Sequence, residues 1–218
     1  MRFAVIPTHN KPDELHECLA SLIGQVNVAI VIDNASDPPV DIPTMPDLPV
    51  IIVRDPEQPP NLSRLWNIGI RMARNLMSEV AVNHIAILND DAVVPPGWAD
   101  SLINVMQTLR ATAACTDPWR TSGHPVQHRG AILSVMERMV GWAFILDGNA
   151  PILADEDLRW WYGDTALDLQ ARRLGGTVIV PGPPVANKHA NMSTTGILAE
   201  QAGKDRATYE IKYGHLPW

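Results

Sequence analysis

The stretch Ile85-Ala86-Ile87-Leu88-Asn89-Asp90-Asp91 joins an uninterrupted apolar run to a cluster of polar side chains. Such an apolar run is typical of a strand covered on both faces, as in a parallel sheet. Three earlier runs have the same character, namely Arg2–Ile6, Val28–Ile32 and Val50–Val53. Segments with helical periodicity lie among these runs, at Pro12–Leu22 and Leu62–Met77. The alternation predicts an open α/β sheet with right-handed crossovers.

Polar clusters follow three of these predicted strands. They are Thr8-His9-Asn10, the stretch Asp33–Asp37, and Asn89-Asp90-Asp91. In open α/β sheets, ligands bind outside the carboxyl ends of the strands. The sequence therefore predicts that the three clusters meet at one ligand-binding edge.

The second half of the chain is less regular. We expect helices at about Gly97–Thr108, Asp164–Leu174 and Gly196–Tyr213, and strands at Ala111–Cys115, Val140–Leu146 and Val178–Val180. The sequence shows neither an internal repeat nor a low-complexity linker. A chain of 218 residues can bury one good core but is short for two, so we expect a single domain.

Composition excludes several classes of partner. The net charge is −7 and basic residues form no cluster beyond short pairs, which argues against a nucleic-acid or anionic-membrane surface. No stretch approaches the roughly 20 apolar residues of a transmembrane helix. The apolar start, Phe3 to Ile6, is too short for a signal-peptide core. These features favour a cytoplasmic protein, with Cys18 and Cys115 as buried free thiols.

The triplet Asn89-Asp90-Asp91 has two readings of equal weight on its own. Carboxylates at the end of a strand can hold Mg²⁺ or Mn²⁺, which also takes phosphate oxygens and water. The alternative is an Asx turn that leaves the strand. His189 is either a surface residue or a further ligand of the same metal.

Other polar residues also have two readings. Asp33 either forms a turn or accepts a hydrogen bond from a nucleoside, and Asp164 is either a helix N-cap or a general base. Within Asn61–Gly69, Arg64 is a candidate for phosphate binding and Asn67 for local hydrogen bonding. Gly69 would permit close helix packing.

The order of motifs resembles family 2-type glycosyltransferases of the GT-A fold, over nearly the whole chain up to about residue 195. The matching elements are Val5–Asn10, Val31–Ser36, Asn61–Gly69, Ile87–Asp91 as an Asn-Asp-Asp form of the DXD motif, Gly141–Leu146, Asp155-Glu156, Trp161–Asp164, Leu167–Arg172, and His189 with Ser193. One departure is Gly163, which stands where the family usually has a Glu before Asp164.

The resemblance implies an inverting, metal-dependent transfer of one sugar from a nucleoside-diphosphate sugar, UDP- or GDP-linked, to an acceptor hydroxyl on a glycan, lipid-linked or protein acceptor. The donor would contact Pro7, Thr8, Asn10, Asp33, Asn34, Arg64, Asn67, Asn89 and Asp90. The metal, Mn²⁺ or Mg²⁺, would bind Asp91 and His189. Asp164 would be the catalytic base, and the acceptor sugar would stack on Trp142, Trp160 and Trp161, although Trp142 fits a buried core equally well.

The single domain would then comprise a nucleotide-sugar-binding half at 1–92, an acceptor-binding half at 93–195, and a C-terminal helix at 196–218 that could mediate homodimerisation. Two alternatives remain. A sugar nucleotidyltransferase would normally carry a Gly-rich basic loop after the first strand, which Pro7-Thr8-His9-Asn10 is not. A non-catalytic nucleotide-sugar-binding module is suggested by the missing Glu before Asp164.

Overall fold

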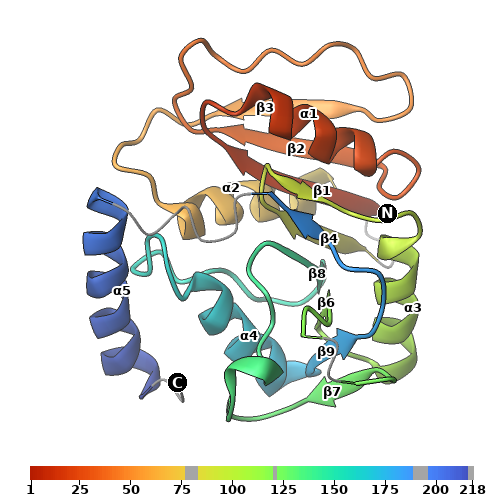
Figure 1. Ribbon diagram of the computed structural model, residues 1–218, viewed down its shortest axis with the longest axis vertical. Helices are drawn as coiled ribbons and strands as arrows, with labels where there is room; N and C mark the ends of the chain where they lie inside the picture. The colour runs from red at the N-terminus through yellow and green to blue at the C-terminus, as the bar shows by residue number, and fades with distance from the viewer. Residues whose placement is uncertain (77–82, 120–121, 189–195, 216–218) are drawn as a thin grey trace.

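A computed structural model describes residues 1–76, 83–119, 122–188 and 196–215. Eight strands form one sheet in the order β3-β2-β1-β4-β8-β6-β9-β7 (Figure 1). Their bounds are β1 (Arg2–Thr8), β2 (Val28–Asp33), β3 (Val50–Arg54), β4 (His84–Leu88), β6 (Ala113–Thr116), β7 (Val126–His128), β8 (Ala143–Asp147) and β9 (Thr177–Val180). A small antiparallel pair joins β5 (Ala92–Val93) to β10 (Ala186–Asn187).

The sheet is mostly parallel, as predicted. β3, β2, β1 and β4 pair in parallel, and β6 pairs in parallel with β9. β8 lies antiparallel between β4 and β6, and β7 is antiparallel to β9 at the edge. β8 lies between the two parallel groups. Because β8 is antiparallel to β4, its first residue, Ala143, lies opposite Leu88 at the carboxyl end of β4.

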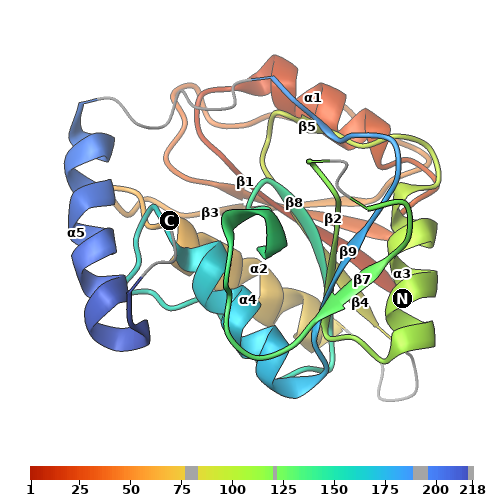
Figure 2. The same ribbon diagram turned by 60° about the horizontal axis from the view of Figure 1, so that its bottom comes forward.

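Helices cover both faces of the sheet (Figure 2). One apolar core contains side chains of α1 (Pro12–Ser21) and α3 (Trp98–Leu109), and the other contains those of α2 (Leu62–Leu76) and α4 (Gly163–Leu174). Successive strand residues alternate between the two cores, as in Ala4 and Ile6 against Phe3 and Val5. The apolar runs of the sequence are thus strands buried on both faces.

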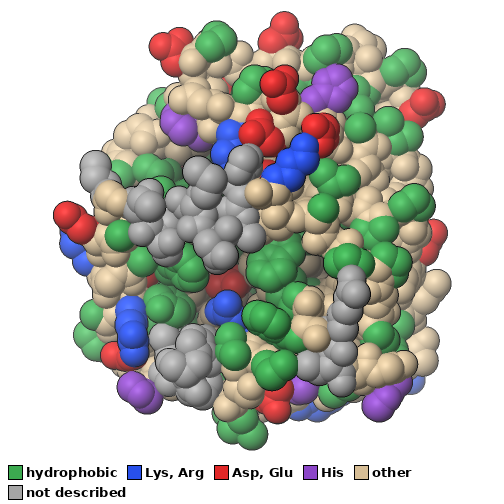
Figure 3. All heavy atoms as spheres, viewed as in Figure 1, with side chains coloured by type: hydrophobic (Ala, Val, Ile, Leu, Met, Phe, Trp, Pro, Cys, Tyr) green, Lys and Arg blue, Asp and Glu red, His purple; other side chains and the backbone are tan. Residues whose placement is uncertain are grey.

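The last helix, α5 (Ile197–Tyr213), packs outside α4, where Tyr209 joins a third apolar cluster with Ala166 and Leu169. A 3-10 turn, η1 (Val135–Glu137), lies before β8. On the face drawn in Figure 3, charged side chains of both signs lie close together in the upper part, and hydrophobic side chains gather below. Among the described residues, no helix is long and apolar enough to span a bilayer.

The predicted elements agree with the structure within about three residues at each end. The short strands β5, β7 and β10 and the turn η1 were not predicted. Strands of two or three residues are too short to show a period-2 pattern, and tertiary pairing alone defines them.

Gly69 allows α2 to pack closely on β1, as predicted. A Cβ atom at this position would lie 2.2 Å from Val5 Cγ1. We expect Gly69→Ala to destabilise the fold by roughly 1 to 3 kcal/mol through overpacking, despite the better helix propensity of alanine. Thermal or urea unfolding measures this loss. Gly203→Ala in α5 is the control, because a Cβ there meets nothing within 4 Å; equal stability of the two variants would contradict the packing argument.

Candidate functional site

The polar ends of β1, β2 and β4 lie side by side. Thr8 stands opposite Asp33 in the parallel β1–β2 pair, and the Asn34 N–H donates to the Thr8 carbonyl at 3.0 Å. The Thr8 hydroxyl donates to Asp90 Oδ2 at 2.9 Å. Pro7 is buried in β1, opposite Ile32. The predicted convergence of three polar clusters at one edge is therefore confirmed.

Asp90 is a buried carboxylate with one nearby cation. Its exposed fraction is 8%, and its Oδ1 lies 3.6 Å from Lys11 Nζ. Burial raises the pKa of Asp90, against the opposing influence of the Lys11 charge and the Thr8 hydrogen bond. Additional positive charge near this carboxyl therefore favours its ionised form.

Asp91 is held by the strand that leads toward His189. The Asn187 amide, oriented to satisfy its hydrogen bonds, donates to both carboxylate oxygens of Asp91 at 3.0 Å. Asn187 pairs with Ala92 across the β5–β10 ladder, and the Lys188 N–H donates to the Asp91 carbonyl at 3.4 Å. His189 lies outside the described residues, but the residue before it is bonded to Asp91.

The donor set of this edge suits a hard divalent cation. Adjacent carboxylates at the end of a rigid strand offer oxygen ligands, and Mg²⁺ needs one or two of these when phosphates and water complete its shell. Within the described ranges, no group of three or more His, Cys, Asp or Glu side chains surrounds a common point. The described side chains of this edge that could offer oxygen ligands are the Asp90 and Asp91 carboxylates, and two such ligands would leave room for substrate oxygens.

Gly141 and Trp142, directly before β8, lie between Asp164 and the turn Asn89-Asp90-Asp91, which we call the acidic turn. The Asn89 N–H donates to the Trp142 carbonyl at 2.9 Å. On the other side, a Cβ added to Gly141 would lie 2.6 Å from Asp164 Oδ2. The absence of a side chain at Gly141 therefore lets the Asp164 carboxylate approach this segment, which also contacts the acidic turn.

Asp164 is not a helix N-cap. Helix α4 begins at Gly163, and the N-cap residue is Tyr162, with φ 66° and no side-chain cap hydrogen bond. Asp164 is half-buried in the first turn, where the N-terminal end of a helix favours negative charge. Its Oδ1 accepts a long hydrogen bond of 3.4 Å from the Thr165 hydroxyl.

The packing of α4 on α2 explains Gly163. A Cβ at this position would lie 2.4 Å from Ser63 Oγ and 3.4 Å from Trp66 Cζ3. A side chain at position 163 would therefore require the Ser63 hydroxyl to move, and this hydroxyl donates a hydrogen bond to the Leu158 carbonyl. The departure from the family pattern is accommodated by Ser63 and Trp66.

A buried ion pair on α4 fixes the chain that leads to Gly141. Arg172 Nε lies 3.0 Å from Asp168 Oδ1, and both side chains are at most 1% exposed. Asp168 Oδ2 accepts from the Met139 N–H at 3.0 Å, and Arg172 donates to the Ala131 carbonyl at 3.1 Å and to the Glu137 carbonyl. The motif Leu167–Arg172 thus anchors residues 131–139.

Asp33 shapes the loop after β2. Its oxygens accept from the Ser36 N–H at 3.0 Å and the Val40 N–H at 3.2 Å. Burial raises the pKa of Asp33, but these hydrogen bonds and the Arg54 charge outweigh it and hold the pKa below its usual value. Asp33 therefore forms the turn that was one of its two readings, and nucleoside binding by the same ionised group stays a prediction.

Asn10 and Asn34 brace neighbouring loops. The Asn10 amide oxygen accepts from the Asp37 N–H at 2.8 Å. The Asn34 amide donates to the Glu57 carbonyl at 3.0 Å and to the Asp55 carbonyl at 3.2 Å. Their side chains thus hold the protein together at this edge, and direct donor contact by either remains a prediction.

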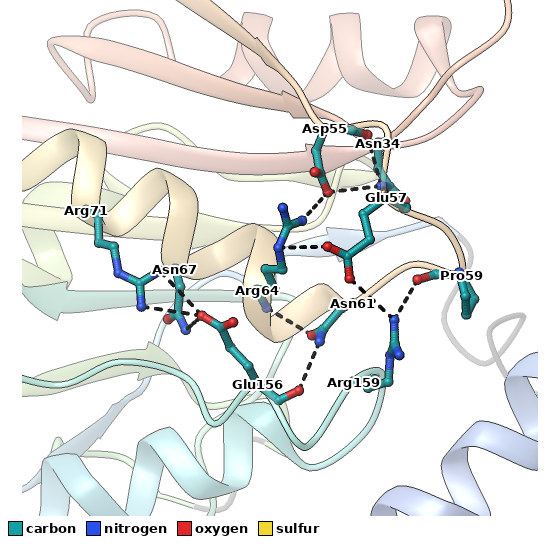
Figure 4. A network of polar contacts seen from close by, with 10 residues as sticks. All are labelled: Asn34, Asp55, Glu57, Pro59, Asn61, Arg64, Asn67, Arg71, Glu156 and Arg159. Atoms are coloured by element: carbon teal, nitrogen blue, oxygen red, sulfur yellow. Dashed lines mark hydrogen bonds and ion pairs between the residues drawn. The ribbon is translucent and has the colours of Figure 1, made fainter.

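Arg64 and Asn67 belong to a polar network between α2 and two loops (Figure 4). Arg64 Nη1 lies 2.6 Å from Asp55 Oδ2, and its Nε lies 3.1 Å from Glu57 Oε2. Asn67 exchanges hydrogen bonds with the backbone of Ala154 at 2.8 and 2.9 Å. The hydrogen bonds of Asn67 are not local as predicted, because Ala154 lies 87 residues further along the chain. Donor contact by Asn67 and phosphate binding by Arg64 stay predictions, and two carboxylates already pair with the Arg64 guanidinium.

The three predicted acceptor-side tryptophans differ in their surroundings. Trp142 is half-buried and packs against both apolar cores, which fits its reading as a core residue. Trp160 and Trp161 are half-buried in the loop before α4. The Trp161 indole Nε1 is buried and has no hydrogen-bond partner among the residues that the structure describes.

Several residues at the site were missed by the sequence reasoning. They are Lys11, Asp55, Gly141 and Asn187. Gly141 is the first residue of the motif Gly141–Leu146, and its lack of a side chain was a usable signal. Lys11 and Asn187 gave none, because their positions depend on how separate strands pair.

With this geometry in view, comparison with known proteins identifies the family. A family model described as glycosyl transferase family 2 matches residues 3–168. The chain belongs to glycosyl transferase family 2. The match covers β1 to the first half of α4, so it contains the acidic turn and Asp164 but not α5. No curated protein matches this family 2 chain significantly.

Solved structures similar to this family 2 chain include forms of S. aureus TarS. A structure of TarS 1-349 in complex with UDP-GlcNAc matches with a TM-score of 0.67 and 13% identity, over 97% of this chain and 66% of that one. A longer TarS structure matches with a TM-score of 0.64 and 14% identity, over 100% of this chain and 41% of that one. The chain thus spans between about two fifths and two thirds of these TarS chains, and at such identities the likeness establishes the GT-A fold alone.

Proposed function

We propose that the protein transfers one sugar, with inversion, from a nucleoside-diphosphate sugar to an acceptor hydroxyl. The observation that carries this proposal is the position of Gly141-Trp142 between two acidic groups. The acidic turn bonds to Trp142 on one side, and the Asp164 carboxylate approaches Gly141 on the other. A donor phosphate at the turn and an acceptor hydroxyl at Asp164 would therefore lie on either side of a shared backbone segment.

Each acidic group has a distinct role in this proposal. Asp91 and His189 would hold Mn²⁺ or Mg²⁺, which when bound would stabilise the negative charge of the diphosphate leaving group, and Asp90 would face the sugar or ribose of the donor. Asp164 would accept the proton of the acceptor hydroxyl as it attacks the anomeric carbon. General base catalysis of this kind typically contributes about 10² to 10⁴ in rate.

The donor is proposed to be UDP-linked. Family membership supports a nucleotide sugar, and the similar TarS structure was determined with UDP-GlcNAc. The turn at Asp33 and the Thr8 backbone form the edge of β1 and β2 on which the nucleoside would lie. The acceptor hydroxyl would reach Asp164 from the side of Trp160 and Trp161.

A thermal-shift screen tests donor binding. Because a ligand that binds only the folded state adds about 2.7 kcal/mol at 100 times its Kd, UDP-GlcNAc with Mn²⁺ should raise the melting temperature by about 5 to 10 °C. UDP, GDP-mannose and ADP-glucose, each with Mn²⁺ and with EDTA, identify the base and the metal dependence. A flat response to every nucleotide in Mn²⁺ would remove the proposal, and binding without release of free sugar would leave a binding module.

A further inference from the structure

Asp205, on α5, holds three consecutive backbone N–H groups. This carboxylate has an exposed fraction of 0%. It accepts from the N–H of Arg159 at 3.1 Å, of Trp160 at 2.7 Å and of Trp161 at 2.8 Å. The Gln201 side chain donates a fourth hydrogen bond at 2.7 Å. A buried carboxylate with four donors is strongly fixed, and so is the chain that supplies three of them.

The same face of α5 contacts this segment at two further points. The Tyr209 ring lies 5.6 Å from the Tyr162 ring. At the end of the helix, Lys212 Nζ lies 2.8 Å from Asp155 Oδ2, and the Tyr213 hydroxyl donates to the same oxygen at 2.8 Å. These contacts recur every three to four residues along α5, which is the spacing of one helix face. The inner face of α5 therefore follows residues 155–162 along their length.

Helix α2 holds this segment from the opposite side. The Ser63 hydroxyl donates to the Leu158 carbonyl at 2.6 Å, and the Leu62 N–H donates to the Arg159 carbonyl at 2.6 Å. Arg159 Nη2 also donates to the Pro59 carbonyl at 2.9 Å. Residues 155–162 are thus held between α2 and α5, and α4 with Asp164 begins directly after them.

We propose that α5 positions the acceptor side of the site, with Asp205 as the positioning residue for Trp160, Trp161 and Asp164. The inference rests on the proposed function, since it assigns a role to the loop that precedes the base. Only two residues separate Trp161 from Asp164, so a shift of the three backbone amides held by Asp205 would displace the Asp164 carboxylate. A displacement of about 1 Å can cost about 10²-fold in rate.

The role is specific to acceptor chemistry because the described partners of Asp205 all lie on α5 or the segment 159–161. Among the described residues, Asp205 makes no hydrogen bond to Thr8, Asp33 or the acidic turn. Loss of the hydrogen bonds from Asp205 to the amides of residues 159–161, which we call the clamp, should therefore lower turnover and leave nucleotide binding unchanged. If α5 only stabilises the fold, loss of its contacts should lower the melting temperature but change neither turnover nor nucleotide binding.

The test uses Asp205→Asn in the full chain. The amide keeps the size of the carboxylate but turns one acceptor into a donor that faces backbone N–H groups. We expect the rate of UDP-GlcNAc hydrolysis in Mn²⁺ to fall at least 10-fold, while the Kd for UDP by calorimetry stays within twofold. Hydrogen exchange of the amides of residues 159–161 should accelerate. Arg206→Ala, which removes an exposed pair with Glu210 on the outer face of α5, is the control for both readouts.

The outcomes separate the two ideas. Faster exchange with a wild-type hydrolysis rate would overturn the positioning role alone. A wild-type protein that neither binds UDP nor hydrolyses UDP-GlcNAc would overturn the proposed function, and the positioning role with it. If Asp205→Asn does not fold, Lys212→Met with Tyr213→Phe releases the contacts of α5 with Asp155; slower hydrolysis with unchanged UDP binding supports the role, and unchanged hydrolysis overturns it.

Discussion

Asp164→Asn should abolish sugar transfer, with a loss of about 10² to 10⁴ in kcat. The side chain keeps its shape beside Gly141 but can no longer take a proton from the acceptor hydroxyl. Nucleotide binding should remain, because the acidic turn and the ends of β1 and β2 are unchanged. Transfer rates and UDP binding by calorimetry, both in Mn²⁺, measure the two effects on one preparation.

Asp13→Asn is a closely matched control for this variant. Asp13 occupies the second position of α1, as Asp164 does in α4, and it is exposed. Both substitutions remove a favourable charge from a helix N-terminus, an effect of about 0.3 to 1 kcal/mol. Equal activity losses in the two variants, or more than a tenth of wild-type turnover in Asp164→Asn, would show that Asp164 is not the base.

Asp91→Ala should weaken nucleotide binding only when divalent metal is present. In Mn²⁺, loss of a carboxylate ligand should weaken UDP binding by at least about 10- to 100-fold, the range seen when groups that support a metal site are removed. In EDTA, binding should be unchanged or slightly tighter, because one negative charge that repels the diphosphate is gone. Calorimetry in the two buffers gives both numbers.

Asp100→Ala serves as the control for Asp91→Ala. Asp100 is an exposed carboxylate on α3 whose described partner is Arg2, and its loss removes the same charge from the protein. It should leave UDP binding unchanged in both buffers. If Asp91→Ala behaves in the same way in Mn²⁺, the carboxylate does not bind the metal, and the triplet is only the turn that leaves β4.

The strands and most helices could be predicted because the buried strands are continuous apolar runs and the apolar residues of the helices recur at helical spacing. Ile85 to Leu88 is an example, since each of these residues is almost fully buried. The convergence of Thr8, Asp33 and Asp90 followed from the rule that parallel strands share one carboxyl edge. An element can be predicted in this way when its own apolar periodicity and the polar residues at its end are visible in one short stretch of sequence.

The role of α5 could not be predicted, because its pattern is the reverse of an amphipathic helix. Asp205 has an exposed fraction of 0%, whereas Ile211 is 86% exposed. A buried Asp is stable only when several donors surround it, and those donors are backbone amides some 45 residues away in the chain. Gly163 was flagged as a departure from the family, but its cause, Ser63 on α2, is visible only in the packing.

The pairing of β5 with β10 has a consequence for the metal affinity of the proposed site. The Lys188 N–H donates a hydrogen bond to the Asp91 carbonyl, so the chain is anchored beside Asp91 at the residue before His189. His189 follows Lys188 directly in the sequence. Short tethers give effective concentrations on the order of millimolar or higher. If His189 binds the metal as proposed, it would be an intramolecular ligand with a high effective concentration. It belongs to the part of the sequence between Lys188, beside Asp91, and α5, which contacts residues 155–162.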